Sequence, residues 1–275
     1  MDEPNRYELM MEALAELKPE IEAAYQSSSL QKPQPQPTQT LPPLHEVLNE
    51  FGPMPPEALF LGVASDGLPV LLNLYDPVPG PILIAGDAGT GKTALLQTIA
   101  LAAGMMHQPE QLQFGALTSH PEDWSGLEDI PNNVGIFPLY HQSSEDFILS
   151  LASWAHGNKS SRQSILLLID DLEAIAKLDF DARQNLRWLL LRGPARRVWP
   201  IITLNPNRME NARPWLDAFH TRVFGSTQNV HLARQMDAEN ADLDSLNIGS
   251  QFAMREGDHW LRFWIPSIDY EVPHN

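Results

Sequence analysis

The segment ILIAGDAGTGKTALLQTIALAA, residues 82–103, constrains the fold of this chain more than any other part of its sequence. A short apolar strand at Ile82–Ala85 leads into the loop Gly86–Thr93, and an apolar helical run follows at Ala94–Ala103. Strand, glycine-rich loop and helix, in this order, form the context in which G-x-x-x-x-G-K-T binds phosphate groups. The segment therefore predicts a phosphate-binding loop inside an α/β core.

The residue types of this loop suit a nucleoside triphosphate. Glycines let the backbone approach the phosphates, and successive N–H groups together with a helix N-terminus attract anions. Lys92 adds a positive charge for the outer phosphates, and the hydroxyl of Thr93 suits the oxygen shell of Mg²⁺. The sequence thus predicts ATP and Mg²⁺ as ligands. The predicted nucleotide-binding residues are Gly86, Asp87, Ala88, Gly89, Thr90, Gly91, Lys92 and Thr93.

A second motif lies downstream in SILLLIDD, residues 164–171. Its continuous apolar run predicts a strand buried on both faces that ends in paired carboxylates, which is the Walker B pattern. Asp170 is expected to hold Mg²⁺ through water, and Asp171 to orient and activate the attacking water. Capping of the next helix is the alternative role for Asp171. If Asp171 is not the base, Glu173 or another group must serve.

The remaining pattern predicts a mostly parallel sheet covered on both faces by helices. A hairpin with its turn at Ser65-Asp66-Gly67 precedes the phosphate-binding loop. Ligands of such sheets bind at the carboxyl ends of strands, where Gly86, Asp170 and Asn205 all emerge. The expected hairpin strands are 58–64 and 68–74, the later strands are 112–118, 134–140 and 198–204, and the helices are 145–155 and 181–191.

Four parts of the chain are expected from its patterning. Residues 1–26 carry apolar side chains at helical spacing and predict an amphipathic helix. Residues 27–56 predict a Pro/Gln-rich linker with a short connecting helix, residues 57–270 the ATPase domain, and residues 271–275 a tail. The apolar stripe of the first helix needs a cover, which is either another protein or the chain's own core.

Composition narrows the class of protein. The absence of cysteine rules out disulfides and thiolate metal sites, and an acidic N-terminus with only short apolar runs predicts a soluble, cytoplasmic chain. A net charge of -17 argues against a general nucleic-acid coat or a membrane-surface protein, so any DNA contact must be local. A local basic cluster is available, although its members could equally be ordinary helix-surface charges: Arg183, Arg187, Arg192, Arg196 and Arg197.

From about Leu61 to Pro266 the sequence resembles the FtsK/HerA-like motor ATPases. The stretch LGVASDGLPVLLNLYDPVPGPILIAGDAGTGKTALLQTIA is similar to the family's hairpin and phosphate-binding loop, and ILLLIDDLEAI to its Walker B strand. IITLNP, FHTRVFGST and LNIGSQFAM resemble the family's later strands in the same order. Two positions depart from the family pattern: Asp171 stands for the usual Glu, and Asn205 for the usual Gln that senses the γ-phosphate.

The resemblance implies a RecA-like core, a homo-oligomeric ring with ATP between subunits, and translocation along double-stranded DNA. It makes Arg222 and Arg234 candidates for an arginine finger that reaches the neighbouring subunit's phosphates, with surface salt bridges as the alternative. The leading hypothesis is an ATP-hydrolysing motor core acting on DNA. Two alternatives stay open: an ATPase that energises a protein assembly or secretion system, and a nucleotide-dependent scaffold that does not hydrolyse ATP.

Overall fold

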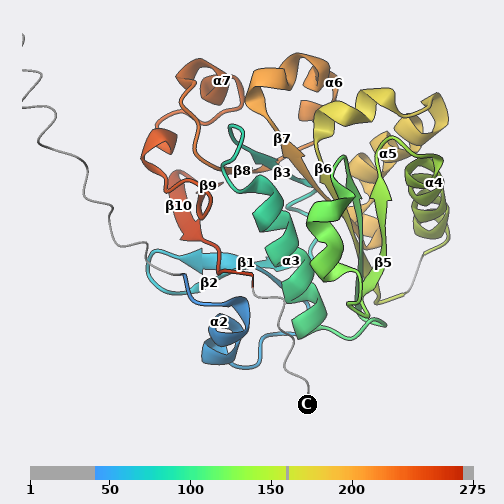
Figure 1. The fold of residues 1–275 in the computed structure, drawn as a ribbon, viewed down its shortest axis with the longest axis horizontal. Helices are drawn as coiled ribbons and strands as arrows, with labels where there is room; N and C mark the ends of the chain where they lie inside the picture. The colour runs from blue at the N-terminus through green and yellow to red at the C-terminus, as the bar shows by residue number, and fades with distance from the viewer. Residues whose placement is uncertain (1–40, 159–160, 269–275) are drawn as a thin grey trace, which may run out of the picture. The chain divides into compact units, whose positions relative to one another are not determined.

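The computed structural model describes residues 41–158 and 161–268, drawn in colour in Figure 1. The predicted helix at 1–26, most of the predicted linker and the tail at 271–275 lie outside these residues. The compact unit that contains the core starts at Leu41. The reason is helix α2 (Leu44–Phe51), whose Leu44 and Val47 are buried in the same apolar cluster as strand β1.

A single ten-stranded sheet organises this unit, in the order β2-β1-β10-β9-β8-β3-β7-β6-β4-β5. Six neighbouring strands, from β8 to β5, run parallel, whereas β1, β2, β9 and β10 pair antiparallel. The strands are β1 Ala58–Ala64, β2 Pro69–Asn73, β3 Ile82–Ala85, β4 Leu112–Thr118, β5 Asn133–Pro138, β6 Ser164–Asp170, β7 Val198–Leu204, β8 Thr221–Phe224, β9 Gln251–Glu256 and β10 His259–Trp264.

Helices cover both faces of the sheet, so the core has two apolar layers. One layer joins α3 (Lys92–Met106) and α2 to the sheet, and the other joins α4 (Gln142–Gly157) and α5 (Phe180–Arg192). Neighbouring strand residues alternate between the layers, as Ile82 and Leu83 do on β3. Figure 1 shows α3 in front of the central strands. The short helices α6 (Arg213–Leu216) and α7 (Val230–Gln235) follow β7 and β8.

The predicted fold class is confirmed: an α/β P-loop fold with a mostly parallel sheet and antiparallel hairpins. The strands predicted at 58–64, 112–118 and 198–204 have the expected bounds, and α4 is longer than the predicted 145–155. Strand β10 was not predicted, and it is the strand that joins the β1–β2 hairpin to the main sheet. Within the residues that the structure describes, no helix has the length and apolarity needed to span a membrane.

Candidate functional site

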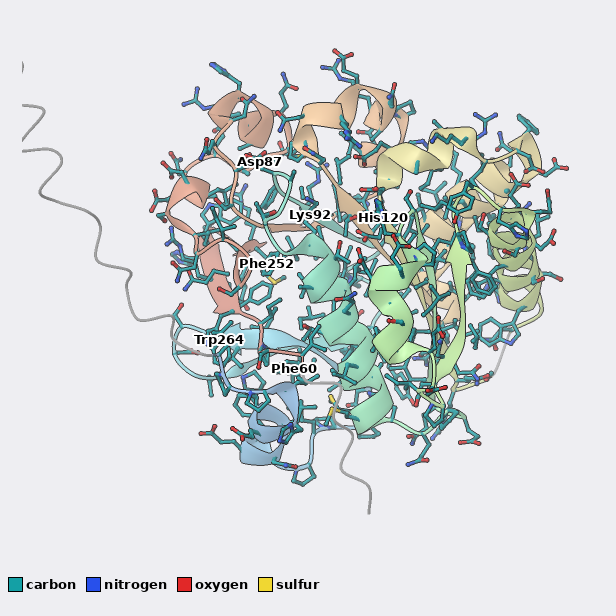
Figure 2. The ribbon with its side chains drawn as sticks, in the orientation of Figure 1. Phe60, Asp87, Lys92, His120, Phe252 and Trp264 are labelled. Carbon is teal, nitrogen blue, oxygen red and sulfur yellow. The ribbon has the colours of Figure 1, made fainter. Side chains whose placement is uncertain are left out.

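The loop Gly86–Thr93 connects β3 to α3, as its sequence predicts. Gly89 and Gly91 have φ values of 76° and 88°, a backbone region that side chains with a Cβ rarely adopt. Lys92 Nζ donates to the carbonyl oxygens of Gly86 at 2.9 Å and Asp87 at 2.8 Å, so the lysine folds back over its own loop. Figure 2 shows Asp87 and Lys92 together at the N-terminal end of α3.

Burial lowers the pKa of Lys92, and nearby carboxylates oppose that shift. These carboxylates belong to Asp170, Asp171, Glu173 and Asp87, in decreasing order of effect. The loop and the end of β6 therefore form one electrostatic site, with a single lysine beside several acids.

The two predicted motifs meet at Thr93 and Asp170. The hydroxyl of Thr93 donates to Asp170 Oδ2 at 2.7 Å, although the two residues are 77 positions apart. The other carboxylate oxygen, Oδ1, accepts a hydrogen bond of 2.8 Å from Thr203 Oγ1. Burial raises the pKa of Asp170, and these two hydroxyl donors oppose the shift. A hydroxyl and a carboxylate in contact are the oxygen ligands that Mg²⁺ prefers.

Asp171 has an unusual backbone at the end of the Walker B strand. Its φ of 93° and ψ of 88° lie outside the regions that non-glycine residues ordinarily occupy. It precedes the 3-10 helix Leu172–Lys177, but its side chain makes no capping hydrogen bond. The alternative role as a helix cap therefore has no support in the geometry. Strain of this kind costs on the order of 1–3 kcal/mol and is concentrated at functional sites.

Glu173 is a second buried acid beside the site, which the sequence pattern singled out only as a reserve base. Both of its carboxylate oxygens are buried and form no hydrogen bond within the described residues. Its side chain is 9% exposed, and the guanidinium of Arg208 lies 3.8 Å away with 65% exposure. Burial raises the pKa of Glu173, Asp171 adds to the shift, and Arg208 and Lys92 oppose it. Only the tertiary fold could reveal that this carboxylate lacks a hydrogen-bond partner among the described residues.

Asn205 lies at the same edge of the sheet, because Leu204 of β7 accepts a hydrogen bond from Gly86 N at 3.2 Å. Its side chain accepts from Asn207 N at 3.1 Å and caps the short helix after β7. The side-chain amide Nδ2 of Asn207 donates to Asp87 Oδ1 at 3.2 Å. The segment after β7 therefore contacts the phosphate-binding loop through Asn207, while Asn205 supports that segment.

The carboxylate of Asp87 is held by the segments that follow β7 and β8. Besides Asn207, it accepts hydrogen bonds from Thr227 Oγ1 and Gln228 N, both at 3.0 Å. These three uncharged donors satisfy the Asp87 carboxylate, which would otherwise be an unpaired acid beside an anion-binding loop. Asp87 thereby ties the loop to the segment that follows β8.

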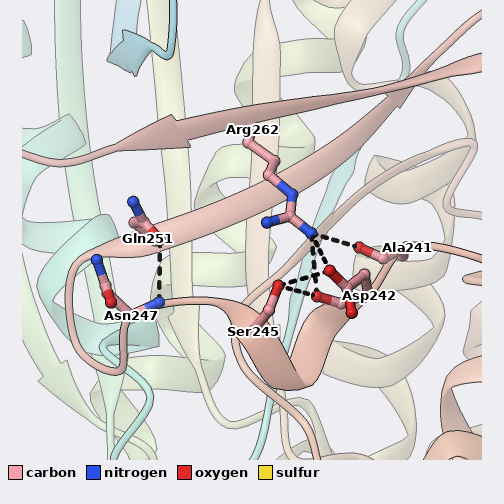
Figure 3. A network of polar contacts seen from close by, with 6 residues as sticks. All are labelled: Ala241, Asp242, Ser245, Asn247, Gln251 and Arg262. Atoms are coloured by element: carbon pink, nitrogen blue, oxygen red, sulfur yellow. Dashed lines mark hydrogen bonds and ion pairs between the residues drawn. The ribbon is translucent and has the colours of Figure 1, made fainter.

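The loop before β9 packs directly on the phosphate-binding loop. A Cβ atom placed at Gly91 would lie 2.6 Å from the carbonyl oxygen of Gly249. The segment that leads to Gly249 is fixed by Arg262 of β10, whose Nη2 donates to Asp242 Oδ2 at 3.0 Å and to the Ala241 carbonyl at 3.4 Å (Figure 3). Strands from the C-terminal part of the chain therefore shape the nucleotide loop.

Replacing Gly91 by alanine is expected to destabilise the fold by about 3 kcal/mol, from left-handed backbone strain and a clash with Gly249. Gly89→Ala is the matched control, because Gly89 also has a positive φ but open space at its Cβ. That control should cost only about 1 kcal/mol. Urea unfolding of both variants measures the difference, and equal losses would contradict the close packing of Gly249 on Gly91.

The two candidate arginine fingers differ in their surroundings. Arg222 donates to Asp237 Oδ2 at 2.8 Å and to the Leu216 and Phe219 carbonyls at 3.2 Å. It therefore forms the salt bridge foreseen as its alternative role. Arg234 is exposed on α7 and forms no ion pair with any described residue.

The predicted basic cluster is partly committed to contacts within the chain. The guanidinium of Arg197 lies 4.0 Å from the ring centre of Tyr75 and donates to the Leu74 carbonyl at 3.0 Å. Arg196 donates to the Asn158 carbonyl at 3.2 Å. Arg187 and Arg192 are exposed on α5. These exposed arginines are the part of the cluster that remains available for phosphate contacts.

The tryptophans fit the core role expected from their periodic segments. Trp199 of β7 is fully buried, and Trp260 packs edge-on against Phe224 at 5.8 Å between ring centres. Trp188 stacks on His156 at 3.7 Å. Base stacking is therefore not needed to explain them.

Comparison with known proteins agrees with this geometry. The NACHT domain family model matches residues 80–240, which include the phosphate-binding loop and the Walker B strand. None of the curated proteins matches the sequence.

Several solved structures share the fold. EssC (ATPases 2 and 3) from Geobacillus thermodenitrificans has a TM-score of 0.64 at 16% identity, covering 80% of this chain and 49% of that one. The cytoplasmic domain of the Thermomonospora curvata type VII secretion ATPase EccC has a TM-score of 0.60 at 16% identity, covering 80% and 30%. The pCW3 conjugation coupling protein TcpA with ATPγS has a TM-score of 0.57 at 13% identity, covering 82% and 69%.

This chain thus spans about half the length of the EssC structure and less than a third of the EccC structure. At these identities the likeness establishes the fold. Since the family model covers more than half of its 275 residues, the chain belongs to the NACHT domain family, and its fold is that of the FtsK/HerA-like P-loop ATPases.

Proposed function

We propose that this chain binds ATP together with Mg²⁺ and hydrolyses it. The observation that carries the proposal is the 2.7 Å hydrogen bond between Thr93 and Asp170, which brings the last residue of the phosphate-binding loop to the end of the Walker B strand. The oxygen ligands there suit a hard divalent cation, and Lys92 interacts electrostatically with Asp170. A magnesium ion bound at this point would neutralise charge on the phosphates.

The chain's own residues have separable roles in this proposal. Backbone N–H groups of Gly89 to Lys92 would bind the phosphates, and Lys92 would exchange its bonds to the loop carbonyls for the outer phosphates. Thr93 and Asp170 would hold the magnesium, Asp170 through water. Asp171 would accept the proton of the attacking water, since its carboxylate makes no capping bond and it directly follows the strand that ends in Asp170.

Arg234 is the better candidate for a residue acting on a neighbouring subunit's nucleotide in a ring. Its side chain is exposed, whereas Arg222 is held by Asp237 and by backbone carbonyls. It lies on α7, which follows the Thr227 and Gln228 segment bonded to Asp87. The nucleotide loop and the proposed subunit contact would thus be joined by a short stretch of chain.

We propose double-stranded DNA as the polymer on which the motor acts, in the cytoplasm. Exposed Arg187 and Arg192 supply local positive charge, and the TcpA structure belongs to a conjugation coupling protein. The competing candidate is a protein substrate, because the EccC structure belongs to a secretion ATPase. Replacing both arginines by alanine would abolish the stimulation of ATP hydrolysis by DNA but would leave stimulation by a protein substrate unchanged.

Phosphate release with and without double-stranded DNA tests this choice, alongside mass measurement with ATP and Mg²⁺. For a DNA motor we expect severalfold stimulation at low salt, falling as salt rises, and a mass of several subunits. The double variant Arg187→Ala, Arg192→Ala should lose the stimulation and keep basal turnover. Stimulation that persists in that variant, or none in the wild type, would reject DNA contact through this surface.

A further inference from the structure

Thr203 is a buried hydroxyl in an otherwise apolar strand. Strand β7 reads VWPIITL, every residue of it is buried, and Thr203 itself is 0% exposed. A buried hydroxyl costs free energy unless it is hydrogen-bonded, and valine would fill the same volume without that cost. The hydrogen bonds of this hydroxyl must therefore offset the free-energy cost of burying it.

Both partners of this hydroxyl belong to the Walker B motif. Thr203 Oγ1 donates to Asp170 Oδ1 at 2.8 Å and accepts from the backbone N–H of Asp171 at 2.8 Å. One hydroxyl can do both at once, because it has one proton and two lone pairs. Strand register makes this possible, since Ile169 of β6 pairs with Ile202 of β7, so the next residues lie side by side.

The contact fixes two geometries that the proposed chemistry needs. Asp170 has one oxygen on Thr93 and the other on Thr203, so its carboxylate plane is set by two hydroxyls from different elements. Asp171 is held in its left-handed backbone conformation, in which the N–H bond to Thr203 offsets part of the strain. Removing the hydroxyl would release Oδ1 of Asp170, leaving only the Thr93 bond to hold the carboxylate, and would leave the Asp171 N–H without this partner.

We propose that Thr203 is a positioning residue, which orients Asp170 toward the magnesium site and holds Asp171 in the conformation that presents its carboxylate to water. This inference rests on the proposed Mg²⁺-dependent ATP binding and adds a residue from a third strand to the site. Groups that orient metal ligands from outside their shell typically contribute about 10–100-fold to metal affinity or activity.

The test is the Mg²⁺ dependence of ATPγS binding by the full-length chain, measured by calorimetry, with binding in EDTA as reference. In Thr203→Val the Mg²⁺ concentration for half-maximal enhancement should rise about 10–100-fold. Binding in EDTA should stay within about twofold of wild type, since Thr203 faces the carboxylates and not the phosphate loop. Thr203→Ser, which keeps the hydroxyl, should restore the wild-type requirement.

Thr98→Val is the matched control, because Thr98 is also 0% exposed and its hydroxyl bonds only the Ala94 carbonyl within α3. If Thr203→Val does not fold, Thr203→Ser against Thr203→Ala gives the same comparison, with one oxygen as the difference.

Thr93→Ala separates failure of this inference from failure of the proposed function. Loss of Mg²⁺ dependence in Thr93→Ala with a wild-type requirement in Thr203→Val would overturn the role of Thr203 alone. A wild-type chain whose nucleotide binding ignores Mg²⁺ would overturn both.

Discussion

The variant Lys92→Ala is expected to bind ATP about 100-fold more weakly than the wild type and to release no measurable phosphate. A charge-assisted hydrogen bond contributes about 1.5–3 kcal/mol, which corresponds to roughly 10–100-fold in affinity. Lys92 also offsets the carboxylates of Asp170, Asp171 and Glu173, so its loss leaves a strongly negative site facing an anionic ligand. Calorimetric titration with ATPγS and Mg²⁺ measures the affinity.

Lys177→Ala is the matched control for this variant. Lys177 is exposed at the end of the 3-10 helix that follows Asp171. Its substitution by alanine therefore removes the same charge close to the site but outside the phosphate-binding loop. Its ATP affinity should stay within about twofold of wild type. Wild-type affinity in Lys92→Ala would show that this loop does not hold the phosphates.

The variant Asp171→Asn is expected to keep ATP affinity and to lose about 100- to 10,000-fold in turnover, the range that a general base contributes. Asparagine preserves the shape and the backbone conformation, since asparagine tolerates the left-handed region better than most residues. Single-turnover phosphate release at saturating ATP separates this chemical defect from any change in binding.

Glu173→Gln is the competing variant, because Glu173 is a further carboxylate that interacts electrostatically with both Asp171 and Lys92. With Asp171 as the base, Glu173→Gln should keep turnover within severalfold of wild type. The opposite pattern, with turnover lost in Glu173→Gln and kept in Asp171→Asn, would transfer the role of base to Glu173.

Stability measurements should show that Glu173→Gln is not simply unfolded. Burial raises the pKa of Glu173, so the folded state disfavours the charged form. The penalty is absent below the ordinary pKa of glutamate, where both states are protonated, and it is complete above the raised pKa of the folded state. At neutral pH the glutamine variant should therefore be at least as stable as the wild type, and the difference should vanish in acid.

The meeting of Thr93 with Asp170 could be predicted from the sequence, because both residues lie in short, local motifs beside strands. The positions of Lys92, Thr93 and Asp170 follow from one loop and one apolar strand, and parallel strands bring their carboxyl ends to one edge. Strand lengths follow from the same apolar runs. The local sequence motifs and the parallel strand order therefore predict the same edge of the sheet for these residues.

The contacts that refine the site come from residues distant in sequence, and these could not be predicted. Gly249 lies against Gly91 because β9 pairs with β8 and β10 pairs with β1, which are contacts between segments distant in sequence. The Gly257-Asp258 turn between two apolar segments is a local sign of the β9–β10 hairpin, but it does not identify the strands on which the hairpin packs. The lack of a hydrogen-bond partner at the Glu173 carboxylate and the bridging position of the Thr203 hydroxyl depend on how separate segments pack. The burial of α2 in the same apolar cluster as β1 is likewise a tertiary property.

The most direct measurement is the initial rate of phosphate release from ATP by the full-length chain, in Mg²⁺ and in EDTA, with Asp170→Ala measured in parallel. If Thr93 and Asp170 form the magnesium site of an ATPase, release should be steady in Mg²⁺, absent in EDTA and absent in Asp170→Ala. Tight ATP binding with no release in Mg²⁺ would instead identify a nucleotide-dependent scaffold and contradict hydrolysis.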